Sequence, residues 1–140
     1  MTLPIPESHL DLITRPLHGV LTTMMPDGQP QSSLVWCDHD GECVRVHTSL
    51  ERQKGRNMAA NPKVSLLIVD PQDTSRFISI RGDVEIVYRN AVSELDVITR
   101  QYTPHPKYYG YVFPESKQLL ETRIVCRIYP SKITLDAIHK

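Results

Sequence analysis

The sequence predicts a mainly β, α+β fold, namely an antiparallel barrel of about six to seven strands with two or three helices packed around it. Strand-like runs follow one another with turn residues between them, and the regular strand–helix alternation of a doubly wound parallel sheet is missing. The longest run, Phe77–Arg89, alternates apolar and polar residues, so one of its faces belongs to a core. With 140 residues, the chain predicts a single domain, residues 1–140.

The first half of the chain predicts a short helix and three antiparallel strands. The segment Pro6–Arg15 has apolar residues at helical spacing after Ser8, a candidate cap, and it ends before Pro16. Turns rich in Gly, Asp and Pro separate the strands, which are expected at Val20–Met25, Gln31–Asp38 and Cys43–Thr48.

The second half predicts two more helices and a further set of strands. Asn61-Pro62 ends the helix expected at Glu51–Ala60, because the residue before a proline is biased out of the helical region. Gly82, in the middle of the long strand, indicates a bulge of the kind that lets a sheet curl. The remaining elements are a helix at Ala91–Tyr102 and strands at Val64–Val69, Phe77–Arg89, Arg123–Tyr129 and Lys132–Ile138.

The overall composition narrows the classes of partner. The 16 basic and 16 acidic residues leave no net charge, so the chain has no global attraction for nucleic acid or an anionic membrane. No apolar run approaches the roughly 18 residues of a membrane span, and the chain as given starts without a secretory signal. We therefore expect a cytoplasmic protein that binds a small molecule and neither nucleic acid nor a membrane.

The cysteines and histidines show no pattern of a disulfide framework or a metal site. Cys37, Cys43 and Cys126 lie in strand-like stretches and form no C-x-x-C pair, which predicts free, buried thiols. The six histidines lack ligand spacing such as H-x-x-x-H. We therefore expect no bound metal.

Positive charge gathers where the strand Cys43–Thr48 leads into the following helix. From Arg45 to Lys63 the sequence has five basic residues and a single acid, Glu51. Hydroxyl groups at the strand end and free backbone N–H groups at the helix start strengthen the attraction for an anion, so this cluster is a candidate phosphate site. The alternative is an ordinary solvated helix surface.

Several short motifs, in their order and at their separations, carry a resemblance to a known family over most of the chain. They are Leu21-Thr22-Thr23 with Pro26-Asp27-Gly28-Gln29-Pro30, Val35-Trp36, Val46-His47-Thr48 with Lys54 and Asn57, Asn61-Pro62-Lys63-Val64-Ser65-Leu66-Leu67, and Ile80-Arg81-Gly82-Asp83-Val84-Glu85-Ile86. With these motifs the chain resembles the pyridoxamine 5'-phosphate oxidase-like, FMN-binding split barrel family. Its short length is most similar to the branch of F420-dependent oxidoreductases. The resemblance implies a split β-barrel and a homodimer.

The resemblance also implies a site for a phosphorylated cofactor, coenzyme F420 or FMN. In the family, a Thr at the end of the third strand and a Lys in the following helix hold the phosphate, and these positions are Thr48 and Lys54 here. The second strand runs along the ring system of the cofactor. The cofactor-binding residues expected from the resemblance and its neighbourhood are Ser32, Val35, Trp36, Thr48, Ser49, Arg52, Lys54, Arg56 and Asn57. No catalytic residue is assigned.

This chain departs from members of the family in two respects. FMN-binding members often carry a basic residue in the second strand, where this chain has Ser32 or Ser33, so Arg52 or Arg56 would have to compensate. True pyridoxamine-phosphate oxidases are longer and carry a C-terminal substrate-binding segment, whereas this chain ends at Lys140. We therefore do not expect that reaction.

The function expected from these features is a flavin- or deazaflavin-dependent oxidoreductase that transfers a hydride to or from an unidentified small molecule. A non-catalytic carrier or redox sensor would use the same pocket and stays open as an alternative. Nucleic-acid binding by the basic stretch is a further alternative, which the neutral overall charge disfavours. Tyr108, Tyr109 and Tyr111 form either an aromatic lip over the cofactor or ordinary packing and dimer contacts.

Overall fold

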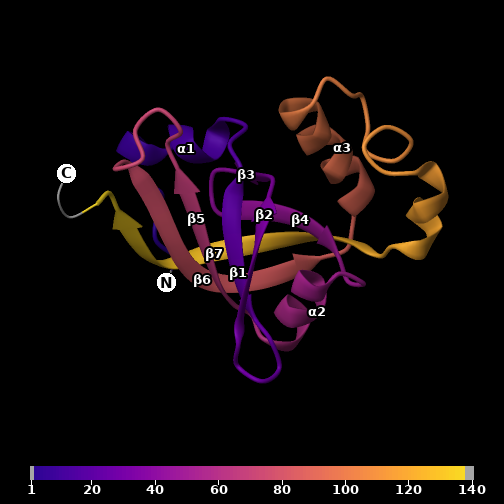
Figure 1. The fold of residues 1–140 in the computed structure, drawn as a ribbon, viewed down its shortest axis with the longest axis horizontal. Helices are drawn as coiled ribbons and strands as arrows, with labels where there is room; N and C mark the ends of the chain where they lie inside the picture. Colours follow the sequence, from indigo (N-terminus) through magenta and orange to yellow (C-terminus); the bar gives the residue numbers. More distant parts are fainter. Residues whose placement is uncertain (1, 138–140) are drawn as a thin grey trace.

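The computed structural model describes residues 2–137, and their strands form one antiparallel sheet in the order β2-β1-β5-β6-β7-β4-β3 (Figure 1). The predicted mainly β, split-barrel fold is confirmed. The strands β2 and β3 lie at opposite edges of the sheet, yet only Trp36 separates them in sequence, so the sheet curls until its edges approach each other. The bounds are β1 Gly19–Met24, β2 Pro30–Val35, β3 Cys37–His39, β4 Val44–Ser49, β5 Lys63–Val69, β6 Phe77–Val87 and β7 Arg123–Leu135.

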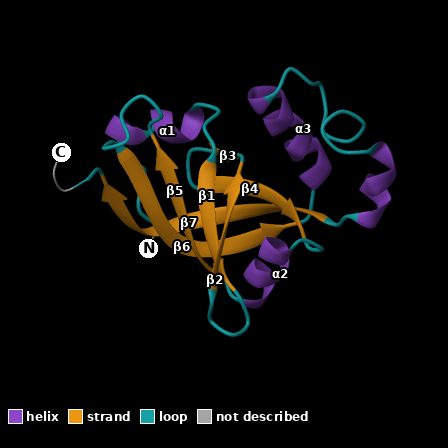
Figure 2. Ribbon diagram, in the orientation of Figure 1, coloured by secondary structure: helices purple, strands orange, loops and turns teal. Residues whose placement is uncertain are grey.

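The helices lie outside the curled sheet, with α1 and α3 toward opposite ends (Figure 2). The expected helix Pro6–Arg15 was wrong as one element, because it is a 3-10 turn followed by four α-helical residues that are held by burial of Leu12 and Ile13. A second 3-10 helix was not predicted. The bounds are η1 Glu7–His9, α1 Asp11–Thr14, α2 Gln53–Ala60, α3 Ala91–Tyr102 and η2 Glu115–Leu120. Within residues 2–137, no helix has the length and apolar character that crossing a bilayer requires.

Two strand predictions need correction. The sequence predicted separate strands on either side of Pro130, but β7 runs continuously through it. The register between β6 and β7 shifts between Arg81 and Gly82, which confirms the bulge expected at Gly82 and accommodates Pro130 opposite this glycine. A Cβ at Gly82 would lie 2.2 Å from the carbonyl oxygen of Tyr129, so only glycine fits this approach.

The expected strand Gln31–Asp38 is likewise divided into β2 and β3 at Trp36, where the chain passes from one edge of the sheet to the other. Part of the last predicted strand also falls beyond the structure, because Ile138 lies outside the described residues.

The core fills the inside of the curled sheet. Alternation along the strands aligns Leu21, Leu66 and Ile80 in one row across β1, β5 and β6, and all three are fully buried. A second, smaller cluster of Leu95, Ile98, Tyr108 and Tyr109 lies where α3 packs against β7. The predicted free, buried thiols are confirmed at Cys37, Cys43 and Cys126. The candidate site lies between these two clusters.

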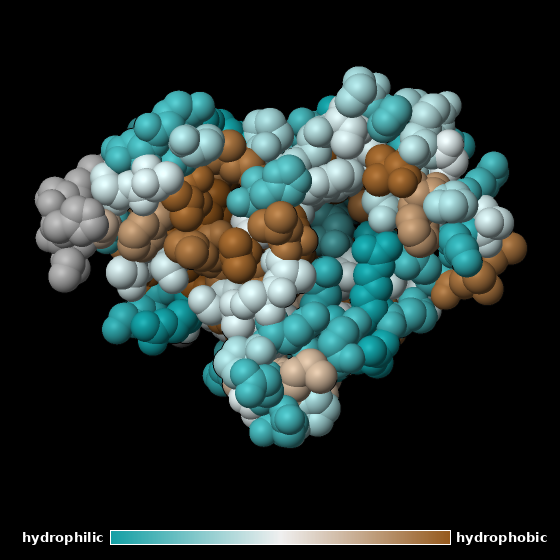
Figure 3. Space-filling view, in the orientation of Figure 1, coloured by the Kyte–Doolittle hydropathy of each residue, from teal (hydrophilic) through white to brown (hydrophobic). Residues whose placement is uncertain are grey.

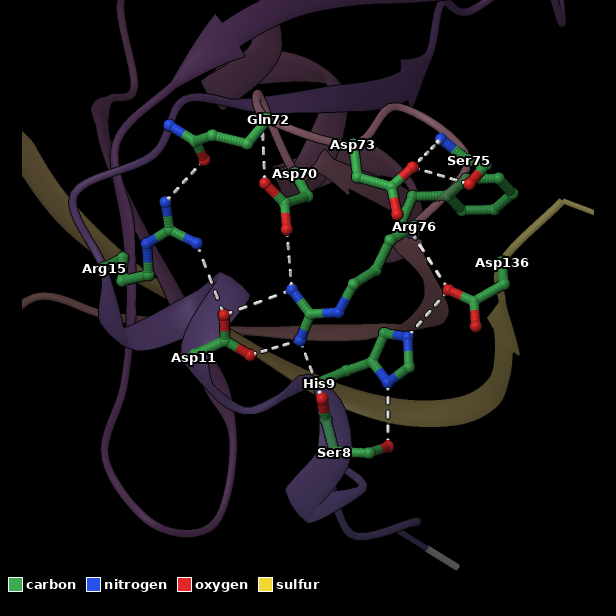
Figure 4. A network of polar contacts seen from close by, with 11 residues as sticks. Ser8, His9, Asp11, Arg15, Asp70, Gln72, Asp73, Ser75, Arg76 and Asp136 are labelled. Atoms are coloured by element: carbon green, nitrogen blue, oxygen red, sulfur yellow. Dashed lines mark hydrogen bonds and ion pairs between the residues drawn. The ribbon is translucent and has the colours of Figure 1, made fainter. Parts of the chain in front are cut away.

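A polar network ties the first helical turns to the β5–β6 connection and the end of β7 (Figure 4). The guanidinium group of Arg76 donates hydrogen bonds to the carboxylates of Asp11 and Asp70. His9 Nε2 lies 2.8 Å from Asp136 Oδ1. The Arg76 hydrogen bond lowers the pKa of Asp11 despite some desolvation. These contacts hold one end of the half-barrel together, away from the candidate site.

Candidate functional site

A cavity of about 300 Å³ opens between the β2–β3 junction, β4, the start of α2, and α3 with the loop that follows it. Aromatic and aliphatic side chains cover much of its wall, while three cationic side chains gather on another part. The lining residues are His18, Leu34, Val35, Trp36, His47, Arg52, Lys54, Leu95, Tyr108, Val112 and Arg123. An apolar wall with a few convergent charged groups is the usual character of a small-molecule site.

Lys54 is placed in the first turn of α2, so its side chain reaches across to the edge strand β2. Its Nζ donates a hydrogen bond of 3.3 Å to Ser33 Oγ. Lys54 has no ion pair with a carboxylate in the described part of the chain. Partial burial lowers the pKa of Lys54, and the positive charges of Arg52 and Arg123 lower it further. The three cations therefore lie close enough to repel one another, which favours an anion between them.

Glu121 is the carboxylate that offsets part of this positive charge. Its Oε2 accepts hydrogen bonds of 3.3 Å from both Ser49 Oγ and Arg52 Nε, and its Oε1 accepts one of 2.6 Å from Tyr109 Oη. Arg123 Nη1 lies 3.5 Å from Oε1. Burial alone would raise the pKa of Glu121, but the Tyr109 hydrogen bond and the two arginines outweigh it and lower the pKa. Glu121 is therefore an anion at neutral pH.

Two buried polar side chains of the cavity lack hydrogen-bond partners. The Arg123 side chain is only 3% exposed, and apart from the 3.5 Å ion pair of Nη1 with Glu121, its Nε and Nη1 have no hydrogen-bond partner among the described residues. Both ring nitrogens of His47 are also without one. Burial lowers the pKa of His47 to about 4 although Asp38 lies nearby, so the imidazole is neutral at pH 7. Buried polar atoms are normally satisfied, so these groups point to a missing water or ligand.

Four of the residues expected to bind the cofactor line this cavity, namely Val35, Trp36, Arg52 and Lys54. Trp36 stacks on Tyr102 with ring centroids 5.3 Å apart. Its position follows from the break between β2 and β3, which turns the indole toward α3.

Two more expected residues lie next to the cavity at the buried end of β4. Ser49 reaches the carboxylate of Glu121, and the Thr48 hydroxyl is fully buried with no partner among the described residues. Neither side chain lines the cavity. Strand alternation explains the difference between them, because Thr48 shares the core face of β4 with Val46, while Ser49 shares the opposite face with His47.

The structure places Ser32, Arg56 and Asn57 away from the cavity. Ser32 points to the other face of β2, where its hydroxyl lies 2.8 Å from Thr22 Oγ1. Arg56 is exposed on the far side of α2 from Lys54, as two residues of helical rotation require. Asn57 is buried and donates a hydrogen bond of 3.0 Å to Thr23 Oγ1.

Sequence reasoning missed four polar residues of the site, namely His18, His47, Arg123 and Glu121. The alternation along β4 had already separated His47 from the core face, and that was a usable signal. Arg123 comes next to it only through the pairing of β4 with β7. No pattern marks Glu121, which lies after η2 in an irregular segment.

The tyrosine-rich loop was expected either to form an aromatic lip over the cofactor or to provide packing and dimer contacts, and the structure shows features of lip and packing. Tyr108 and Tyr109 are buried in the second cluster, as packing requires, and Tyr108 also forms part of the cavity wall. Tyr111 is exposed and does not line the cavity.

The curled antiparallel sheet, with a cavity between its edge and α3, defines a protein of the split β-barrel class. Residues 5–134 match the family model of pyridoxamine 5'-phosphate oxidase, and the chain belongs to that family. A search of curated proteins finds no match to the sequence.

Solved structures agree with this assignment. A protein described as an F420 reductase is 32% identical, with a TM-score of 0.79, and the match covers 93% of this chain and 98% of the other. A conserved hypothetical protein from Mycobacterium tuberculosis is 26% identical, with a TM-score of 0.73 and 96% and 86% coverage. General Stress Protein 26 from Bacillus anthracis, at 19% identity and a TM-score of 0.64 over 93% and 92%, shares the fold.

Proposed function

We propose that this chain is an oxidoreductase that binds coenzyme F420 or FMN in the cavity and passes a hydride to or from a small molecule. The observation that carries the proposal is the convergence of Arg52, Lys54 and Arg123 on one part of a cavity that is otherwise largely aromatic and aliphatic. Membership of the pyridoxamine 5'-phosphate oxidase family and the 32% identity to an F420 reductase support it.

The charges of the site fit a phosphorylated cofactor. Three positive charges against the single negative charge of Glu121 leave two positive charges, while a phosphate monoester carries about −1.5 to −2 at neutral pH. Hydrogen bonds to charged groups contribute roughly 1.5–3 kcal/mol each. Arg52 and Lys54, which line the cavity, would hold the phosphate, and Trp36 and Val35 would flank the ring system.

The side chains of the site are suited to binding and orientation. The bound ring supplies the hydride chemistry. His47 stays neutral at pH 7 with its ring nitrogens buried, and burial raises the pKa of the Cys37 and Cys126 thiols to about 12. The protein therefore positions the ring, binds the phosphate by its positive charges and excludes water from the site. The proposal includes no covalent step on a protein side chain.

The outer face of the sheet supports a homodimer. Val20 pairs with Leu34 on one side and Leu67 on the other, so these three apolar side chains form a row across β2, β1 and β5. Hydrophobic surface gathers over β1 and β5 (Figure 3). Leu34 is 67% exposed and also lines the cavity. We propose that a second copy covers this row and closes the cavity on that side.

Replacement of Lys54 tests the cofactor site. We expect Lys54→Ala to weaken binding of coenzyme F420 or FMN at least about tenfold, because it removes a charge-assisted contact to the phosphate. Both cofactors are titrated in parallel against purified protein, with the melting temperature as a check of folding. Lys63→Ala is the matched control, since Lys63 pairs with Asp83 on the surface outside the cavity.

The outcomes of this titration separate the parts of the proposal. Unchanged affinity in Lys54→Ala would remove Lys54 from the site, and a wild-type protein that binds neither cofactor would refute the oxidoreductase assignment. A second assay mixes the reduced complex with candidate acceptors. Binding without oxidation of the cofactor would favour the carrier or sensor.

A further inference from the structure

The three hydrogen-bond donors to Glu121 and its ion-pair partner Arg123 come from four different parts of the chain. Ser49 ends β4, Arg52 precedes α2, Tyr109 belongs to the loop after α3, and Arg123 begins β7. The Glu121 side chain is 11% exposed. Its carboxylate is therefore a largely buried negative charge in contact with Arg52 and Arg123, two of the three cations of the proposed phosphate site.

The other carboxylates near the site do not compete for this role. Asp38 accepts hydrogen bonds of 2.8 Å from Arg45 Nε and 2.9 Å from Arg45 Nη2. Glu51 is exposed and accepts a hydrogen bond from the backbone N–H of Thr122. Only Glu121 makes contacts with cations of the cavity wall in the described residues.

A fixed negative charge makes the binding free energy of an anion less favourable, by an amount proportional to the charge of that anion. Glu121 therefore disfavours a phosphate monoester dianion by twice as much free energy as a phosphodiester monoanion at the same place, and it leaves a neutral ligand unaffected. Its effect on the dissociation constant of the dianion is then the square of its effect on that of the monoanion.

We propose that Glu121 sets the charge selectivity of the cavity: its negative charge weakens the binding of a phosphomonoester dianion more than that of a phosphodiester monoanion on the same ring. This inference rests on the proposed function, because it takes the cavity to bind a phosphorylated ring. Glu121 acts through Arg52 and Arg123 and is a specificity-determining residue without direct contact to the ligand.

The test uses three ligands that share one ring and differ in charge. Riboflavin is neutral, the monomethyl ester of FMN is a monoanionic phosphodiester, and FMN is a dianion at pH 8, since the second pKa of a phosphate monoester is about 6. The same three tails are prepared on the deazaflavin ring. Dissociation constants are measured for the wild type and for Glu121→Gln.

We expect Glu121→Gln to tighten binding of the dianion about tenfold, of the monoanion about threefold, and of the neutral ligand not at all. The amide keeps an oxygen for Ser49 and Arg52 and can donate to Tyr109 Oη, so of the local contacts only the ion pair with Arg123 is lost. Glu115→Gln is the matched control, because it removes the same charge from exposed η2, where solvent screens it.

The results that overturn the inference differ from those that overturn the proposed function. An equal change for monoanion and dianion, or weaker binding of both, would show that Glu121 only supports the arginines. No binding by the wild type in either ring series would refute the proposed function and the inference with it. If Glu121→Gln does not fold, Glu121→Ala is used, in which water can replace the carboxylate. Its affinity for the dianion must then increase more than its affinity for the monoanion, as expected for Glu121→Gln.

Discussion

At the scale of single residues, burial shifts the pKa of the His47 imidazole into the range of mild acid. The imidazole lies on the outer face of β4, where Leu95 of α3 and Tyr108 also line the cavity, and its ring nitrogens have no partner among the described residues. The charged groups around it are Asp38, which favours protonation, and Arg45 and Arg123, which oppose it. Desolvation is the largest effect and lowers the pKa to about 4.

This shift predicts a loss of stability in mild acid. Between about pH 6.5 and 4 the unfolded chain binds a proton at His47 that the folded chain does not, so the free energy of unfolding falls as the pH falls. From pH 6.5 to 5, before most carboxylates titrate, His47 should account for roughly 1.5 kcal/mol. Urea unfolding of the wild type and of His47→Gln across this range measures it. An equal slope in the two proteins would contradict the prediction.

At the scale of elements, the contact between α2 and the end of β4 determines where Lys54 lies. A Cβ on Gly55 would be 2.0 Å from the carbonyl oxygen of Ser49, so the helix approaches the strand as closely as it does only because this residue is glycine. The sequence predicted a helix and a cationic cluster here. It could not predict the close approach, since helix propensity alone would favour alanine at this position.

Gly55→Ala tests this contact, because propensity and packing predict opposite results. Propensity would stabilise the helix by about 1 kcal/mol, whereas the clash should destabilise the protein by roughly 1–3 kcal/mol and shift Lys54. We expect a lower melting temperature and weaker cofactor binding. Ala59→Ser, an exposed change on the same helix, should leave the affinity unchanged. A melting temperature above that of the wild type would refute the packing argument.

At the scale of the whole molecule, the apolar row of Val20, Leu34 and Leu67 lies on the outer face of a sheet whose other face is the core, with Leu34 exposed and the other two half-buried. Strands with two apolar faces need cover on both sides. Because Leu34 belongs both to this row and to the cavity wall, pairing of two copies would change the cavity as well.

We expect Leu34→Glu to convert the proposed dimer into a monomer, since it would bury a charge in the apolar row at the proposed interface. Light scattering coupled to size-exclusion chromatography measures the mass. Leu119→Glu is the control, because Leu119 is 95% exposed on η2, away from the row. A wild-type protein of monomer mass at micromolar concentration would refute the proposed dimer.

The sequence by itself determined most of the strands, their inward faces and the bulge, because alternation with a period of two and glycine at a special position are local properties, but it missed the break at Trp36 and the continuity of β7 through Pro130. The basic residues before and in α2, including Arg52 and Lys54, were equally visible. What the sequence did not determine was which of them meet in the cavity: Arg56 lies close to Lys54 in the chain and points elsewhere.

Only the tertiary structure decided the charge balance of the site. Glu121 and Ser49 are 72 residues apart and meet because β7 pairs with β4, and Tyr109 joins them from the loop that packs over both strands. Contacts of this kind leave no periodic trace in a sequence, since they depend on how distant elements pack. The physical reason is that backbone alternation determines to which face of the sheet a side chain points, whereas the pairing of strands distant in sequence determines which side chains become its neighbours.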